Sequence, residues 1–324
     1  MIVDAHAHLV PAELLAEIRK EKSRFPSVRQ IEDGGLALAF AGGKPTRPVP
    51  RPLSDVAARV AWMTTQKIDR QVVGGWVDMF GYELPAEEGD VWARLANDVL
   101  LDAARAEPRF LPLATVPMQD GVRAATVLKN AVKAGFAGAM IGTLPRGVGS
   151  TLDHADLDPF WAAADETGAV IHIHPSFDAG DVRVNDFGLA NGLGRITDAV
   201  IAVARLVSSG HVTKYVNAKF FVPMGAAGLP FVLGRLKRNA AITKGVGDPV
   251  EGLARLYTDT ILHDARVLKF VVEMIGTERL MMGSDMPFPI GDVEPMKIVS
   301  EAGLKDEQAV SINGGLAARL FRLK

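Results

Sequence analysis

Cysteine is absent from the 324 residues of this chain, and its absence excludes several kinds of chemistry. The chain forms no disulfide, offers no thiolate nucleophile and cannot bind a metal through sulfur. Any metal must therefore be held by histidine and carboxylate side chains. A chain without disulfides also suits the cytoplasm, where we expect the protein.

A surplus of positive charge and a long apolar run are missing as well. The 36 Lys and Arg residues are balanced by 38 Asp and Glu residues, which leaves a formal net charge of -2. Binding to the phosphate backbone of a nucleic acid requires an excess of Lys and Arg residues, so we expect no nucleic-acid partner. No segment offers the roughly 18 uninterrupted apolar residues of a membrane span, and the first residues lack the pattern of a signal peptide. We therefore expect no membrane partner.

Hydrophobic residues make up 48% of the chain and charged residues 23%, which is ample material for a large core. Short apolar runs rich in β-branched residues alternate with longer segments of helical period. This alternation predicts a parallel sheet covered by helices. The predicted strands are 2–4, 70–74, 111–116, 137–142, 169–174, 219–222, 256–260 and 280–284, and the predicted helices are 91–106, 122–133, 158–166, 197–208, 265–275 and 304–320.

Eight strands that alternate with helices predict an α/β fold, the (β/α)8 TIM barrel, with 1–324 as a single domain. One segment interrupts the alternation. Residues 24–52 contain two Gly-Gly pairs and a group of prolines, which argue against a regular helix. We interpret them as an irregular insertion over the barrel mouth, after the first strand and helix. The Gly- and Asp-rich segment 176–194 is predicted to be an active-site loop.

Residues able to bind a metal end three of the predicted strands. His6 and His8 follow the first strand, and their spacing of two places both imidazoles on one side of an extended chain. His174 ends the fifth strand, with His172 one layer deeper, and Asp285 follows the eighth. Active sites of TIM barrels lie at the carboxyl ends of the strands, so these groups are expected to converge around Zn2+ or a similar ion.

His172 has two possible roles, because a position one layer deeper favours a buried residue beneath the metal over a ligand. The other histidines, His154, His211 and His263, are expected to be structural or exposed.

With these residues in place, the chain resembles the amidohydrolase superfamily, in particular its decarboxylase branch typified by aminocarboxymuconate-semialdehyde decarboxylase. The resemblance extends over nearly the whole length and is carried by several motifs together. They are Val-Asp-Ala-His-Ala-His-Leu-Val-Pro at the start, the segments 108–120, 135–143 and 257–264, His-Ile-His-Pro at 172–175, and Met-Gly-Ser-Asp-Met-Pro-Phe-Pro at 282–289.

The resemblance implies that His6, His8, His174 and Asp285 hold one Zn2+ and that a water molecule completes its coordination. The ion would lower the pKa of that water toward neutrality. Other members of the superfamily bridge two metals with a carboxylated lysine at the end of the fourth strand. No lysine lies there in this chain, which favours a single metal.

The resemblance also implies that arginines bind a carboxylate substrate and that one of them enters from the second subunit of a homodimer. Arg235 matches the cross-subunit position, and either Arg47 or Arg51 matches the arginine of the first insertion. The planar guanidinium suits this role because it binds a carboxylate with two hydrogen bonds. Met224 and Phe288 are further candidates for contact with the substrate.

One position departs from the family pattern. Decarboxylases of the family carry an acid/base histidine after the sixth strand, where this chain has Met224, and a thioether does not transfer protons. Three interpretations stay open. The chain is a decarboxylase whose proton transfer uses Asp285 or His172, a metal-dependent hydrolase or hydratase, or a metal-binding relative without activity.

Overall fold

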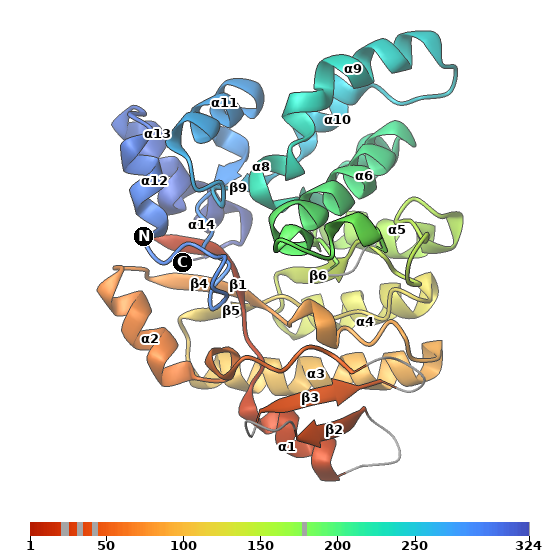
Figure 1. Ribbon diagram of the computed structural model, residues 1–324, viewed down its shortest axis with the longest axis vertical. Helices are drawn as coiled ribbons and strands as arrows, with labels where there is room; N and C mark the ends of the chain where they lie inside the picture. The colour runs from red at the N-terminus through yellow and green to blue at the C-terminus, as the bar shows by residue number, and fades with distance from the viewer. Residues whose placement is uncertain (21–25, 31–34, 41–44, 177–179, 324) are drawn as a thin grey trace.

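The computed structural model describes residues 1–324 except 21–25, 31–34, 41–44, 177–179 and 324. Short strands lie at the centre and helices surround them, which confirms the α/β class (Figure 1). Every residue of β1, β6 and β7 is buried, as expected for parallel strands covered on both faces. The strands are β1 (Val3–His8), β2 (Ser27–Gln30), β3 (Leu36–Ala39), β4 (Arg70–Gly74), β5 (Phe110–Pro112), β6 (Gly138–Gly142), β7 (Val170–His174), β8 (Lys219–Phe221), β9 (Thr258–Asp259) and β10 (Leu280–Met281).

All strand pairs except β2–β3 are parallel. β4 lies between β1 and β5, β7 lies between β6 and β8, and β9 pairs with β10. These pairings place the carboxyl ends of neighbouring strands at the same edge of each sheet. Isolated parallel bridges occur in addition between Ala114 and Ala139, between Phe221 and Tyr257, and between Ala7 and Met286.

Each of the eight predicted strand segments overlaps an observed strand. Their lengths differ from the prediction, because β9 and β10 have only two residues each while β1 continues to His8. The extension of β1 matters for function, since it places His6 and His8 inside a strand, where the alternation of side chains turns both imidazoles to one face.

Long helices cover the strands, and several begin or end at a clear signal. The Asp120 side chain accepts hydrogen bonds from two backbone N–H groups at the start of α4, and Gly135 ends that helix with φ 114°. No helix among the described ranges is long and apolar enough to cross a membrane. The helices are α1 (Ala12–Lys20), α2 (Val56–Thr65), α3 (Ala86–Ala106), α4 (Gly121–Ala134), α5 (Asp158–Thr167), α6 (Arg195–Ser208), α7 (His211–Lys214), α8 (Pro223–Ala227), α9 (Leu229–Ile242), α10 (Pro249–Arg255), α11 (Ala265–Ile275), α12 (Pro295–Glu301), α13 (Asp306–Val310) and α14 (Leu316–Leu320).

The predicted helix 304–320 is interrupted, because a wider π-type turn over Ser311–Gly315 separates α13 from α14. Gly314 causes the interruption: a Cβ at this position would lie 2.2 Å from the backbone oxygen of Met1. The close approach of the two chain segments therefore determines the local backbone.

The insertion 24–52 contains regular structure that the sequence did not predict, so its description as irregular was wrong. β2 and β3 form an antiparallel pair, with Ser27 opposite Ala39. The prolines that argued against regular structure begin at Pro45, beyond the pair, so they remove no hydrogen-bond donor from it. Leu38 and Phe40 are buried in a cluster with Trp92 of α3, which anchors the insertion to the body of the protein.

Candidate metal centre

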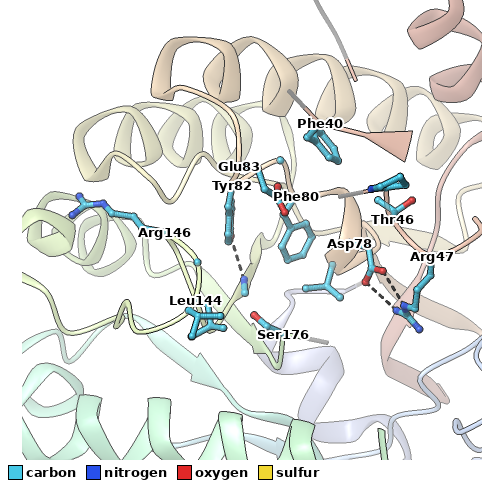
Figure 2. Close-up of a pocket in the computed structure, with 16 residues that line it drawn as sticks. Phe40, Thr46, Arg47, Asp78, Phe80, Tyr82, Glu83, Leu144, Arg146 and Ser176 are labelled. Atoms are coloured by element: carbon cyan, nitrogen blue, oxygen red, sulfur yellow. Dashed lines mark hydrogen bonds and ion pairs between the residues drawn. The ribbon is translucent and has the colours of Figure 1, made fainter. Parts of the chain in front are cut away.

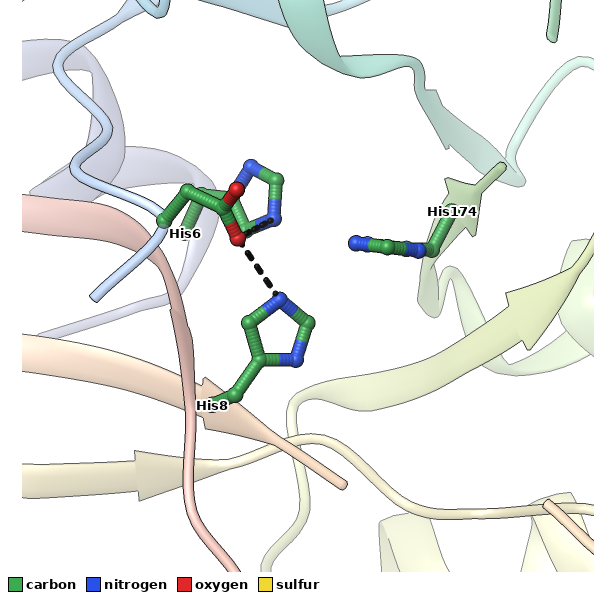
Figure 3. Close-up of side chains that lie close together, drawn as sticks. His6, His8 and His174 are labelled. Atoms are coloured by element: carbon green, nitrogen blue, oxygen red, sulfur yellow. Dashed lines mark ion pairs between the residues drawn. The ribbon is translucent and has the colours of Figure 1, made fainter. Parts of the chain in front are cut away.

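Four side chains from distant parts of the chain converge beyond the carboxyl ends of the strands. His6 and His8 lie in β1, His174 ends β7, and Asp285 follows β10. All four are buried, and one possible ligand atom of each lies within 4.8 Å of the others. Figure 3 shows the three imidazoles turned toward a common centre. The structure thus brings together the four residues that the sequence selected.

Each of the three imidazoles has an oxygen atom beside its Nδ1. The distances are 2.8 Å from His6 to Asp259 Oδ2, 2.9 Å from His8 to the carbonyl of Gly75, and 2.9 Å from His174 to the carbonyl of Pro175. Carbonyl and carboxylate oxygens accept hydrogen bonds, so Nδ1 carries the proton in each ring. Each Nε2 is then left with a lone pair directed at the common centre.

These lone pairs face a carboxylate without a proton between them. Oδ1 of Asp285 lies 3.0 Å from Nε2 of His8 and 3.6 Å from Nε2 of His6. Among the described residues, none of these three buried atoms has a hydrogen-bond partner of suitable geometry. Buried acceptors that face one another are unfavourable unless a cation or a proton lies between them. Three imidazole nitrogens and one carboxylate therefore fit a divalent ion such as zinc or manganese.

The electrostatics of the site favour the metal-binding protonation states of His8, His174 and Asp285, whereas those at His6 favour its protonated form in the absence of a metal. Burial lowers the pKa of His8 and brings that of His174 well below its usual value. Burial alone would raise the pKa of Asp285, but His8 and His6 outweigh it and lower that pKa. For His6, the Asp259 hydrogen bond and the charge of Asp285 overcome burial and raise the pKa. Neutral imidazoles and an ionised carboxylate are the forms that coordinate a cation.

His172, predicted to act in proton transfer, lies beneath this centre in β7. Its ring centroid is 4.3 Å from that of His6 and 4.3 Å from that of Phe221. Neither ring nitrogen has a hydrogen-bond partner among the described residues, and burial holds its pKa well below the usual value. The ring is therefore neutral, in the deeper position that its sequence spacing predicted.

Asp259 is a site residue that the sequence analysis missed. It ends β9, is fully buried and accepts the Nδ1 proton of His6. Its other oxygen, Oδ1, accepts hydrogen bonds from the backbone N–H groups of Met224 and Ile261. The reasoning that selected Asp285, an acid at the carboxyl end of a strand, applies equally to Asp259 and would have found it.

A second buried carboxyl group ties the strands together below the ligands. Asp4 accepts hydrogen bonds from the Ser284 hydroxyl at 2.5 Å and from the Gln71 amide at 2.7 Å. Gln71 in turn accepts from Arg59, which also bonds the carbonyl of His8. Buried polar networks of this kind hold neighbouring elements in one arrangement when all members are satisfied. This network fixes β1 against the segment that carries Asp285.

A cavity of about 520 Å³ opens at the same edge of the sheets (Figure 2). Gly142, which pairs with the ligand His174 across β6 and β7, forms part of its wall. The wall combines apolar and aromatic side chains with charged and hydroxyl groups, as in pockets where a few polar groups orient a small organic molecule. Its main side chains are Phe40, Arg47, Asp78, Phe80, Tyr82, Leu144 and Ser176.

Arg47 lines this cavity, but its guanidinium is already engaged. Nε and Nη2 lie 2.9 Å from the two carboxylate oxygens of Asp78, and the group lies 5.2 Å from the centre of the Trp76 ring. A bidentate pair of this geometry compensates the charge of the arginine. A substrate carboxylate would therefore share Arg47 with Asp78.

The other predicted substrate residues lie outside the walls of this cavity. The Phe288 ring is 5.1 Å from that of His8, while Arg51 is exposed at the turn before α2. Arg235 is exposed on α9. Met224 lines a separate groove of about 470 Å³ beside α9 and α11. Within one chain, only Arg47 of the predicted arginines reaches the cavity.

A buried arginine that the sequence did not select interacts electrostatically with two of the candidate metal ligands, His174 and Asp285. Arg195 begins α6 and is 8% exposed. Burial and the charge of Arg47 lower its pKa, against the opposing charges of Asp285 and Asp78. It thus adds positive charge that acts on both Asp285 and Asp78. A helix start in a glycine-rich loop carries no charge pattern that would have revealed it.

The remaining histidines have the structural roles predicted for them. His154 is exposed and accepts from the backbone of Asp156, while His211 contacts Ser209 and Asp158 around α7. His263 is exposed in a turn. None of the three belongs to the described metal centre.

Comparison with known proteins gives a consistent result. A family described as amidohydrolase matches residues 3–323. The 2-amino-3-carboxymuconate-6-semialdehyde decarboxylase of Dictyostelium discoideum is 25% identical over 308 residues, which cover 92% of this chain and 84% of that protein. The gamma-resorcylate decarboxylase of Polaromonas sp. is 29% identical over 255 residues, which cover 71% of this chain and 76% of that protein.

Two solved structures share the fold. The 5-carboxyvanillate decarboxylase of Sphingomonas paucimobilis superimposes with a TM-score of 0.82 at 22% identity, covering 100% of this chain and 99% of that one. A dihydroxybenzoic acid decarboxylase of Polaromonas sp., solved with bound manganese and 2-nitroresorcinol, gives 0.80 at 21% identity and covers 99% and 97%.

Proposed function

This chain belongs to the amidohydrolase family, and we propose that it is a metal-dependent, non-oxidative decarboxylase of an aromatic or unsaturated carboxylic acid. The observation that carries the proposal is the convergence of three buried imidazoles and one carboxylate, whose facing atoms include three without a hydrogen-bond partner among the described residues. A cavity large enough for a small aromatic ring lies beside them. Relatives aligned over most of their length are decarboxylases, which supports this reaction.

The proposed cofactor is one divalent ion held by His6, His8, His174 and Asp285. When bound, such an ion supplies Lewis acidity and polarises an oxygen of the substrate. The nitrogen-rich ligand set supports zinc, whereas two structural neighbours contain manganese. The proposal therefore commits to a single divalent site, with zinc as the expected ion and manganese as the alternative.

The arrangement of the strands supports a closed (β/α)8 barrel that comprises 1–324 as one domain. The isolated bridges connect the separate sheets end to end, and the bridge from Ala7 to Met286 returns to β1. In the same proposal the insertion 24–52 covers the mouth, which the position of Phe40 and Arg47 on the cavity wall supports.

The side chains of the site have distinct proposed roles. Asp285 holds the ion and takes part in proton transfer, and His172 stays a candidate for proton transfer from the layer below. Arg47 and Phe288 contact the substrate, whose carboxylate competes with Asp78 for Arg47. Arg235 serves the neighbouring subunit of a homodimer, which its exposure on α9 permits. The homodimer, the cytoplasmic location and substrate contacts of Arg51 and Met224 stay predictions.

Hydrolysis is the second candidate, and Met224 is the observation that favours it. Where decarboxylases of the family carry an acid/base histidine, this residue supplies no proton. Hydrolysis of an ester or amide needs a polarised carbonyl and one group to protonate the leaving atom, a role that Asp285 can fill.

The purified protein with Mn2+ or Zn2+ is incubated with 2,6-dihydroxybenzoate, 5-carboxyvanillate and a panel of aromatic esters and amides. We expect release of CO2 from at least one acid. The double variant His6→Ala, His8→Ala should lose both metal and activity, while His154→Ala, at an exposed histidine, should keep both. Ester or amide cleavage without CO2 would identify a hydrolase, and bound metal without either activity would identify an inactive relative.

A further inference from the structure

Two side chains on the wall of the main cavity carry hydroxyl groups on either side of Gly142. The oxygen of Tyr82 accepts a hydrogen bond from the backbone N–H of Gly142 at 3.2 Å (Figure 2). A Cβ added to Gly142 would lie 3.2 Å from the Tyr82 ring and 3.6 Å from Ser176 Oγ, so both side chains border the same space. Gly142 pairs with the candidate ligand His174, which places this space beside the metal centre.

The Tyr82 hydroxyl has a proton to donate. Its oxygen is occupied by Gly142, but its proton forms no hydrogen bond within the described part of the chain. Burial raises the pKa of the phenol above its usual value, so the group keeps this proton at neutral pH. Tyr82 is therefore available to a bound molecule as a hydrogen-bond donor.

Ser176 presents the opposite polarity to the cavity. A hydroxyl group has one proton, and Thr143 donates its own to Oδ2 of Asp198. Thr143 Oγ1 also lies 3.0 Å from Ser176 Oγ, so the proton in this second contact has to come from Ser176. The backbone N–H of Ser176 holds the arrangement in place by donating to Thr143 Oγ1 and Asp198 Oδ2, at 3.0 Å each. Ser176 Oγ thus offers the cavity lone pairs and no proton.

A donor and an acceptor that border one space favour a particular kind of ligand group. A hydroxyl group both donates and accepts, so it can bond to Tyr82 and Ser176 together. A methoxy or carbonyl oxygen only accepts and can bond only to Tyr82. An apolar group bonds to neither and leaves both polar side chains without a partner in a desolvated pocket, which is unfavourable.

We propose that Tyr82 and Ser176 determine the specificity of this protein by binding one hydroxyl group of the substrate, Tyr82 as donor and Ser176 as acceptor. The inference rests on the proposed function, which takes this cavity as the substrate pocket. Thr143 and Asp198 are positioning residues, because they contact Ser176 and orient its hydroxyl toward the wall.

The test measures binding by calorimetric titration of the metal-loaded protein. The probes are benzoate, 3-hydroxybenzoate and 4-hydroxybenzoate, and the two corresponding methoxybenzoates. The ring position at which wild type binds the hydroxyl compound more tightly is used for all variants. Each affinity ratio between two ligands is compared between two proteins, so that differences in the size and solvation of the ligands cancel.

Wild type should bind the hydroxybenzoate more tightly than the methoxybenzoate, and the methoxybenzoate more tightly than benzoate, by about threefold to tenfold at each step. Tyr82→Phe should abolish the preference for methoxybenzoate over benzoate. Ser176→Ala should abolish only the preference for hydroxybenzoate over methoxybenzoate. The affinity for benzoate and the metal content should stay as in wild type, because benzoate bonds to neither hydroxyl.

The matched controls remove hydroxyl groups elsewhere. Tyr215→Phe removes a hydroxyl that donates to the carbonyl of Asp158, and Ser300→Ala removes one that donates to the carbonyl of Lys297 on α12. Both variants should keep the two preferences of wild type.

Unchanged preferences in Tyr82→Phe and Ser176→Ala would overturn the inference. An equal loss of affinity for all three ligands would also overturn it, since it would show that the residues shape the pocket without recognising the hydroxyl group.

Release of CO2 from the same acids separates this inference from the proposed function. Preferences that the variants lose, in a wild type that releases no CO2, would contradict the decarboxylase function and support the specificity pair. Release of CO2 by a wild type without a preference for the hydroxyl group would support the decarboxylase function and overturn the specificity pair.

Discussion

Nδ1 of His6 lies 2.8 Å from Oδ2 of Asp259, although 253 residues separate them in the chain. Both residues are buried, and Oδ1 of the aspartate is occupied by the backbone N–H groups of Met224 and Ile261. Only Oδ2 is left for the imidazole. The pair therefore fixes the proton on Nδ1 and directs the Nε2 lone pair to the centre, as partners of metal-binding histidines commonly do.

The substitution Asp259→Asn tests this relationship. Because two backbone N–H groups require an acceptor at one side-chain atom, the amide NH2 must face His6. The histidine then has to accept at Nδ1 and carry its proton on Nε2, where it no longer binds a cation. We expect metal affinity to fall about 10- to 100-fold in a calorimetric titration with Zn2+ or Mn2+.

The control for this experiment is Asp248→Asn, at an aspartate that accepts two backbone hydrogen bonds at the start of α10. It should bind metal like the wild type. An Asp259→Asn variant with unchanged affinity would show that the aspartate does not set the tautomer of His6.

The buried imidazole of His172 should make the protein sensitive to acid. Its folded pKa lies well below the usual value because of burial, whereas in the unfolded chain it is near 6.5. Above pH 6.5 His172 is neutral in both the folded and the unfolded state, so it adds no pH dependence to the free energy of unfolding. Below it only the unfolded chain is protonated, so the free energy of unfolding falls by about 1.4 kcal/mol per pH unit until the folded pKa is reached.

The variant His172→Phe removes the pH-dependent contribution of His172 to the free energy of unfolding and retains an aromatic ring beside Phe221. Urea denaturation at about pH 7.5 and about pH 5.5 should show a loss of stability that is smaller than in wild type by about 1 kcal/mol. An identical loss in both proteins would mean that His172 takes up its proton in the folded state. His154→Phe, at an exposed histidine, provides the comparison.

The size of the cavity should depend on Gly142. A methyl group there would lie 3.2 Å from the Tyr82 ring and 3.7 Å from that of Phe80, so it narrows the space without strain in the backbone. We expect Gly142→Ala to raise KM for an aromatic acid about threefold to tenfold, with metal content unchanged.

Gly234→Ala introduces the same methyl group on α9, where no atom lies within 4 Å, and should leave KM unaltered. If Gly142→Ala also left KM unaltered, the cavity beside Tyr82 would not be the substrate pocket.

Asp78 should compete with a substrate carboxylate for Arg47 and so weaken substrate binding. The aspartate side chain is 11% exposed and takes both hydrogen bonds of the guanidinium. Asp78→Asn removes the competing charge, so KM should fall by up to about tenfold at low ionic strength and by less at high ionic strength. A rise in KM, measured by steady-state kinetics at both ionic strengths, would instead show that the pair serves to orient Arg47.

The strands and the ligands could be predicted because each has a local signal. Apolar runs of three to six residues mark the strands, and the spacing of two in His6 and His8 indicates that they share one face. Asp285 was recognised by its place at the end of a strand. These features depend on the chain itself and on the general rule that parallel strands end at one edge.

Not all partners of the ligands could be predicted in the same way. The carbonyl of Gly75 is a backbone group that no sequence pattern marks, whereas Asp259 lies in the predicted strand 256–260 and could have been selected by the same rule as Asp285. The charge of Arg195 acts on the site from the first turn of α6, and the direction of that helix depends on how it packs. The β2–β3 pair was missed because glycines and prolines at its borders obscured four-residue strands.

The joining of β1 to the last strand has a consequence for how the protein acquires its ion. During synthesis His6 and His8 leave the ribosome long before Asp285. A pair of imidazoles in a nascent chain binds transition metals weakly, and its preference among them follows their intrinsic affinity for nitrogen ligands. The four proposed ligands lie together only after the segment that follows β10 has docked against β1, so we expect the choice of ion to be made late in folding.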